Sequence, residues 1–135
     1  ALHTYFKVAA AEEATVLGLE NVHFTEFAKA PAADADPAGV ICFTAETDRI
    51  YQGVPNTIQI RTHARRRLLQ LKTAGADSAI VWNPWIEKAA AMSQMGDDEW
   101  EEFICVESAN CRGFAVGLEP GQEHTLELAL TRQRN

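Results

Sequence analysis

Glu107 is the residue of this sequence whose type and position best suit acid–base chemistry. It ends the run Phe103–Glu107, in which strand alternation puts Phe103, Cys105 and Glu107 on one face. A carboxylate beside apolar neighbours is costly to bury, and partial burial raises its pKa towards the range of a general base. The alternative interpretation is that Glu107 lies at a water-exposed strand end.

His3 is a second candidate, near the start of the chain. In the segment Leu2–Phe6, His3 and Tyr5 share one strand face, whereas Leu2, Thr4 and Phe6 share the other. An imidazole is the side chain most often used to move protons near neutral pH. The alternatives are a structural histidine among aromatic rings and a residue in a frayed chain end.

Trp82 and Asn83 could hold a sugar, and Asp48 is a further polar candidate. Asp48 lies in the polar cluster Glu46–Tyr51, and Trp82 and Asn83 lie in the run Trp82–Trp85. The C–H faces of sugars stack on aromatic rings, and sugar hydroxyls bond to carboxylates and amides. The alternatives are an Asp-led turn for Asp48 and two core tryptophans flanking a turn.

Other charged motifs favour simpler interpretations. The triplet Arg65–Arg67 fits an exposed hairpin turn better than a phosphate site, and the run Asp97–Glu99 fits a solvated acidic turn. His23, His63 and His124 show no metal-ligand spacing with the cysteines. Cys42 and Cys105 lie in apolar runs, which predicts buried thiols in a reducing compartment and a cytoplasmic location.

The elements that must position these residues are mostly short strands. Strands are predicted at Leu2–Val8, Glu13–Leu19, Val40–Thr44, Asp48–Tyr51, Thr57–Thr62, Arg67–Lys72, Ser78–Asn83, Glu102–Glu107, Phe114–Leu118 and His124–Thr131. Ile86–Met95 favours a helix, and Ala28–Gly39 is predicted to be a loop. Regularly spaced strands with turns between them indicate an all-β fold, an antiparallel sandwich or barrel, in a single domain over residues 1–135.

Composition limits the classes of function. The chain has 135 residues, 47% of them hydrophobic, and a net charge of −7. This apolar content excludes a wholly disordered chain. The acidic balance argues against nucleic acid as a main partner. No apolar run approaches the roughly 20 residues of a membrane span, so we expect no membrane partner.

In chain order, the segments that carry these residues resemble the hexose-6-phosphate mutarotase (glucose-6-phosphate 1-epimerase) branch of the aldose 1-epimerases. They are Leu2–Phe6, Thr44–Tyr51, Val81–Trp85, Gly96–Glu99, Cys105–Glu107 and Pro120–Leu126. The resemblance runs the length of the chain. It implies an antiparallel β-sandwich that forms the C-terminal part of a galactose mutarotase-like supersandwich.

The resemblance also implies roles. His3 matches the family's general acid and Glu107 its general base. Asp48 matches a carboxylate that binds the substrate, and Trp82 and Asn83 match the strand that lines the same cleft. The implied reaction interconverts the α and β anomers of a hexose or hexose 6-phosphate by acid–base ring opening. It needs no metal and no redox cofactor.

Members of the family are about twice as long as this chain, and their other half carries a further active-site histidine and the arginines that grip the phosphate. Half a sandwich exposes strand edges and apolar faces, which a second copy of the chain could cover. We therefore predict a homodimer. The alternative to a mutarotase is a non-catalytic carbohydrate-binding or oligomerising β-sandwich module derived from one.

Overall fold

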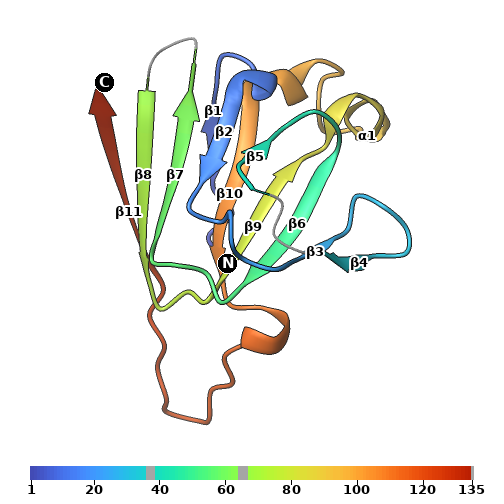
Figure 1. The fold of residues 1–135 in the computed structure, drawn as a ribbon. Helices are drawn as coiled ribbons and strands as arrows, with labels where there is room; N and C mark the ends of the chain where they lie inside the picture. The colour runs from blue at the N-terminus through green and yellow to red at the C-terminus, as the bar shows by residue number, and fades with distance from the viewer. Residues whose placement is uncertain (36–38, 64–66, 135) are drawn as a thin grey trace.

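A computed structural model describes residues 1–35, 39–63 and 67–134 as two antiparallel sheets packed face to face (Figure 1). The first sheet contains, in spatial order, β1 (Tyr5–Lys7), β10 (Phe103–Ala109), β9 (Ser78–Asn83), β6 (Thr47–Gln52), β3 (Phe24–Glu26) and β4 (Ala33–Ala35). The second contains β11 (Glu127–Arg134), β8 (Arg67–Ala74), β7 (Thr57–Thr62), β2 (Ala14–Leu17) and β5 (Ile41–Cys42). The predicted antiparallel β-sandwich is confirmed.

The core lies between the inner faces of the two sheets. Ile58 and Ile60 of β7 are 3% and 0% exposed, and they belong to the same buried cluster as Ile104 and Val106 of β10, both 0% exposed. Period-2 alternation directs these side chains inwards and their neighbours outwards. Burying one such side chain stabilises the fold by about 1.5–3 kcal/mol. The outward side chains of each strand do not contribute to this core and are available for binding or catalysis.

Several candidate site residues lie on the outer face of the first sheet. Strand pairing places Tyr5 opposite Cys105, Cys105 opposite Trp82, and Trp82 opposite Asp48. Residues directly opposite one another share a face, so these four side chains form one row across β1, β10, β9 and β6. Phe6 of β1 and Val81 of β9 point to the core instead.

A short helix follows β9. The helix α1 (Trp85–Ala91) ends earlier than the predicted Ile86–Met95, because the backbone is extended at Met92. Single-turn 3-10 helices occur at Ala11–Glu13, Glu99–Glu102 and Arg112–Phe114. Within the described part of the chain, the helices are too short or too polar to cross a lipid bilayer.

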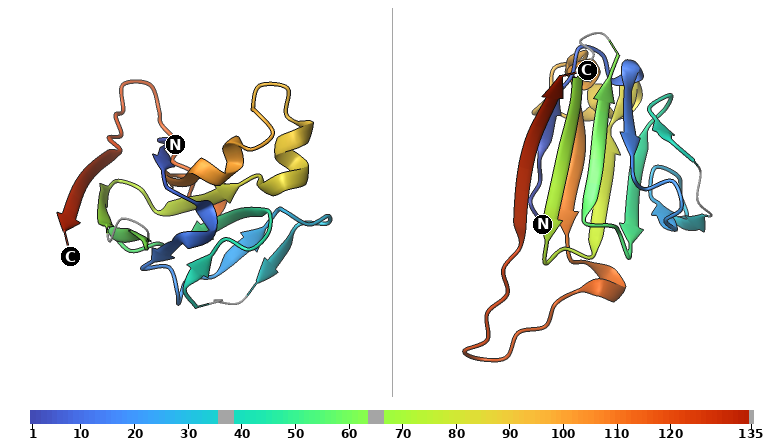
Figure 2. Two further views of the ribbon diagram at one scale, coloured as in Figure 1. Left: turned by 90° about the horizontal axis from the view of Figure 1, so that it is seen from above. Right: turned by 60° about the vertical axis from the view of Figure 1, so that its left-hand side comes forward.

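Several local predictions are wrong. Phe114–Leu118 is not a strand: the segment between β10 and β11 leaves both sheets (Figure 2), and Phe114 and Leu118 are 41% and 55% exposed. The predicted loop Ala28–Gly39 contains β4, and β3 was not predicted. Cys42 is exposed, whereas Cys105 is buried as predicted. Residues 64–66, part of the predicted hairpin turn, lie outside the described residues.

Candidate active site

His3 and Glu107 contact each other on the outer face of the first sheet. The His3 Nε2 atom lies 3.2 Å from the Glu107 Oε1 atom. A backbone bridge from Leu2 to Ser108 extends the β1–β10 register towards the chain start and places His3 beside Glu107. Glu107 is 4% exposed, whereas the His3 side chain is 56% exposed. The structure therefore brings the predicted acid and base together.

Burial controls the protonation of Glu107. Removal from water raises the pKa of its carboxyl group above the ordinary value of 4.5, while the nearby His3 imidazole lowers it and Asp48 raises it. The neighbouring thiol of Cys105 has its pKa raised to about 12, first by burial and then by the charge of Glu107. Burial thus raises the pKa of both groups, the Glu107 carboxyl and the Cys105 thiol.

A group of aromatic rings adjoins this pair through Tyr5. Tyr5 stacks on His3 with ring centroids 5.1 Å apart, and it lies 5.0 Å from Phe103 and 6.2 Å from Trp82. All three rings project from the same sheet face as Cys105. They supply the flat apolar surface that a sugar ring stacks against. Tyr5 was not predicted as a site residue, although its place two residues after His3 puts it on the same face.

Asp48 closes the other side of the cleft. Burial raises the pKa of its carboxyl group, and the Lys88 ammonium lowers it. The Lys88 Nζ atom lies 2.7 Å from Glu46 Oε1 and 3.8 Å from Asp48 Oδ2. The resulting hollow has a volume of about 430 Å³ and is lined by His3, Tyr5, Asp48, Ile80, Trp82, Met92 and Glu107.

Asn83 is not brought into this cleft. Its side chain is fully buried and donates from Nδ2 to the carbonyl oxygens of Trp100 (2.9 Å) and Phe103 (2.8 Å). Its Oδ1 atom accepts from the backbone N–H of Trp85 at 2.9 Å. Trp85 has a φ of 61°, a left-handed conformation that costs a non-glycine residue about 1–3 kcal/mol. Asn83 therefore stabilises the turn that starts α1, the helix that carries Lys88.

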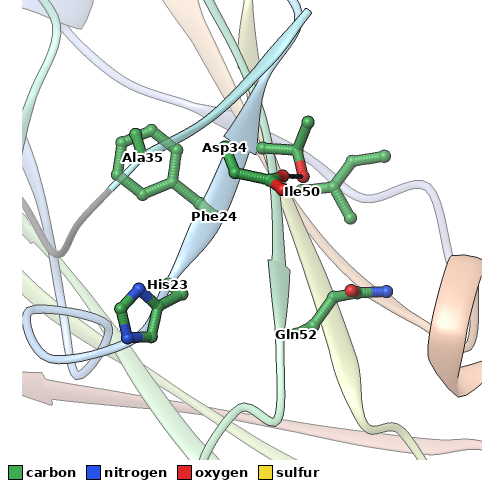
Figure 3. Close-up of a pocket in the computed structure, with 7 residues that line it drawn as sticks. His23, Phe24, Asp34, Ala35, Ile50 and Gln52 are labelled. Carbon is green, nitrogen blue, oxygen red and sulfur yellow. Dashed lines mark hydrogen bonds between the residues drawn. The ribbon is translucent and has the colours of Figure 1, made fainter.

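A second hollow of about 370 Å³ lies further along the same sheet face (Figure 3). Its lining includes His23, Asp34 and Gln52, and the hydroxyl of Thr25 donates to Asp34 Oδ1 at 2.6 Å. Thr25 pairs with Ile50, which in turn pairs with Ile80 of the first hollow. This region was not predicted because β3 was not predicted, although the alternation of Phe24 with His23 and Thr25 was an available signal.

Comparison with known proteins places this chain in one family. The model of the aldose 1-epimerase family matches residues 1–131. A candidate glucose-6-phosphate 1-epimerase of Cenchrus ciliaris is 35% identical over 131 residues, which cover 97% of this chain and 40% of that protein. A protein of Haemophilus influenzae with the same name is 27% identical over 130 residues, which cover 96% of this chain and 45% of that protein.

Two solved structures share the fold. A candidate mutarotase of Salmonella typhimurium matches with a TM-score of 0.71 and 27% identity, over 79% of this chain and 36% of that one. The protein HI1317 matches with a TM-score of 0.76 and 25% identity, over 96% of this chain and 45% of that one. The chain thus spans less than half the length of each of these similar proteins.

Proposed function

The chain belongs to the aldose 1-epimerase family, and from this premise we propose that it supplies the acid–base part of a mutarotase site. The observation that carries the proposal is the direct contact of His3 with Glu107 at the base of an aromatic cleft. In the proposed reaction, Glu107 is the general base and His3 is the general acid. The substrate is a hexose or, as the names of the similar proteins suggest, a hexose 6-phosphate.

The contact between the two groups suits the chemistry of an anomeric carbon. The hydroxyl and the ring oxygen of a cyclic sugar are both bonded to C1, so neighbouring groups on one surface could reach both. Glu107 takes the proton of the C1 hydroxyl, a carbonyl forms at C1, and the C1–ring oxygen bond breaks. The electron pair of that bond goes to the ring oxygen, which takes a proton from His3.

Ring closure reverses these transfers. After rotation about the C1–C2 bond, the ring oxygen attacks the other face of the carbonyl and returns its proton to His3. The new C1 hydroxyl takes its proton back from Glu107. Each group ends in its starting protonation state, so one turnover leaves no net proton to exchange with solvent. The burial that raises the pKa of Glu107 makes its carboxylate a stronger base for this task.

The remaining predicted residues would orient the sugar. We propose that Asp48 accepts hydrogen bonds from sugar hydroxyls and that the Trp82 ring supports the C–H face of the ring. Burial raises the pKa of the Asp48 carboxyl group, and the Lys88 ammonium opposes this rise and so favours the ionised form. For Asn83 we propose a positioning role: it supports the turn before α1 and thereby the placement of Lys88.

Anomer exchange measured by NMR on glucose 6-phosphate tests this proposal. We expect the 135-residue chain to add to the spontaneous rate of anomer exchange. The same measurement on glucose, compared with glucose 6-phosphate, shows whether the phosphate group affects the added rate. Substitution Glu107→Gln should remove the added rate. An added rate that survives Glu107→Gln unchanged would exclude Glu107 as the base.

A non-catalytic module is the second candidate, because the chain spans only 40% to 45% of its similar curated proteins. On that alternative, sugars bind to the cleft without any added anomer exchange. Calorimetric titration with glucose 6-phosphate, run beside the exchange assay, separates the two. Binding with no exchange at any pH would favour the module.

We also propose that the chain forms a homodimer. β11 lies at the edge of the second sheet, where Leu130 is 52% exposed although its strand partner Leu71 is 1% exposed. The inner face of this sheet thus continues as an apolar surface in β11, and a second copy would cover it. Light scattering at micromolar concentration should show a dimer that Leu130→Arg converts to monomer. Only monomer for the unmodified chain would overturn the idea.

The free thiols of Cys42, Cys105 and Cys111 fit a reducing compartment. We therefore propose a cytoplasmic location. Localisation of a fluorescent fusion in the source cells would test it, and export of the chain would contradict it.

A further inference from the structure

Three different metal-ligating side chains converge on the outer face of the first sheet. The ligand atoms of His3, Cys105 and Glu107 all lie within 4.8 Å of one another. One pair of these atoms, His3 Nε2 and Glu107 Oε1, is 3.2 Å apart. Two ligand atoms at about 2.0–2.1 Å from one tetrahedral ion lie at nearly this separation. The cluster therefore needs only small side-chain movements to share an ion.

The backbone holds the three ligands in place. Cys105 and Glu107 are two residues apart on β10, so strand alternation puts both on one face. β1 pairs with β10, and the bridge from Leu2 to Ser108 fixes the backbone next to His3. Two of the three ligands thus come from a central strand, while the exposed His3 faces the solvent from which an ion would arrive.

We propose that this cluster binds Zn²⁺ or a similar thiol-seeking divalent cation, and that the ion blocks the acid–base pair. One imidazole nitrogen, one thiolate and one carboxylate form a ligand set typical of zinc, whereas magnesium and calcium prefer oxygen ligands alone. On binding, the Cys105 thiol releases its proton to solvent. A fourth position is left for water or for a sugar oxygen.

The inhibitory part of this inference rests on the proposed function. An ion bound to His3 Nε2 and to the Glu107 carboxylate occupies the lone pairs that proton transfer requires. The metal is therefore not part of the mutarotase reaction, which uses both groups unbound. The proposed binding of the ion does not depend on the mutarotase function, because it rests only on the geometry of the three ligands.

Spectroscopic titration with Cd²⁺ and Co²⁺ tests the binding directly. The other two thiols, Cys42 and Cys111, are exposed or half-buried, so the experiment uses the double variant Cys42→Ser/Cys111→Ser. We expect one ion per chain and a thiolate-to-metal charge-transfer band in the ultraviolet. Adding Cys105→Ser should abolish the band, and Mg²⁺ at the same concentration should not compete.

His3→Ala supplies a second variant whose fold is not at risk, because His3 is 56% exposed. Mutating a group that only supports a ligand already costs roughly 10–100-fold in metal affinity, so loss of the ligand itself should weaken Zn²⁺ binding by roughly tenfold or more in calorimetry. A charge-transfer band that persists in Cys105→Ser, or an affinity that His3→Ala leaves unchanged, would overturn the site. So would the absence of any band in the double variant.

The inhibition is measured separately, as the fraction of each variant's own anomer exchange that Zn²⁺ removes. We expect the double variant to lose most of its exchange at saturating Zn²⁺, and the variant that also lacks Cys105 to lose much less. Zn²⁺ binding without any added exchange in the metal-free chain would contradict the proposed function and leave the metal site standing. Exchange insensitive to saturating Zn²⁺ would overturn the inhibition.

Discussion

Glu107→Gln separates the chemical role of Glu107 from its structural role. Glutamine has nearly the same shape and can still hydrogen-bond to His3, but it cannot accept a proton. A positioned general base contributes about 10²–10⁴-fold to a rate. The variant should therefore lose this factor in the added anomer exchange, which corresponds to about 2.7–5.4 kcal/mol in the barrier.

The same substitution should not destabilise the fold. Because burial raises the pKa of Glu107 in the folded chain, the folded state binds the proton more tightly than the unfolded state. Stability from this group is fully present below the unfolded value of 4.5 and is lost as the pH rises through the raised folded value. Near neutral pH the wild-type chain has therefore lost this stability, because it buries an ionised carboxylate, whereas the glutamine variant buries a neutral amide.

Two measurements check the reasoning. Anomer exchange by NMR gives the catalytic loss, and thermal unfolding over a pH series gives the stability difference. The matched control is Glu102→Gln, which removes a carboxylate that is 64% exposed and pairs with Lys7 just before β10. A wild type that unfolds at a higher temperature than Glu107→Gln near neutral pH would refute a destabilising effect of burying this carboxylate. An unchanged exchange rate refutes the role as base.

Two further substitutions probe the support of the cleft. Asn83→Asp replaces the amide that donates to the carbonyls of Trp100 and Phe103, so we expect a loss of about 2–4 kcal/mol in the free energy of unfolding by urea; an unchanged midpoint would contradict it. Lys88→Met removes the cation that lowers the pKa of Asp48, so the acid limb of the pH–rate profile should move to higher pH; a profile that stays in place would show that Asp48 does not need this cation.

The strand bounds were predicted most accurately for strands that alternate regularly and lie inside a sheet, with a paired strand on each side. The bounds of β7 and β9 match the predictions Thr57–Thr62 and Ser78–Asn83. Alternation also placed Cys105 and Glu107 on one face. The contact of His3 with Glu107 could not be predicted from local pattern, because it depends on the register between β1 and β10, two strands that lie far apart in the sequence.

Other predictions failed because the alternation of apolar and polar residues does not show whether a segment has a partner strand. Phe114, Val116 and Leu118 alternate like a strand, but no strand of the described residues pairs with them, and they remain exposed. Asn83 follows Trp82 directly, and adjacent strand residues point to opposite faces. The alternation rule therefore separates Trp82 from Asn83, although the family resemblance groups them in one cleft.

The site holds the two proposed reacting groups more firmly than it holds the sugar. The proposed acid and base, His3 and Glu107, are both held by one sheet, since β1 and β10 are paired neighbours. The sugar is not fixed to the same degree, because the cleft is an open face on which Tyr5 is 53% exposed. Orientation of a bound reactant is worth up to about 7–11 kcal/mol of a barrier. Strong catalysis therefore requires a second surface over this face, and a covering chain segment or a second copy would raise the rate without adding a reacting group.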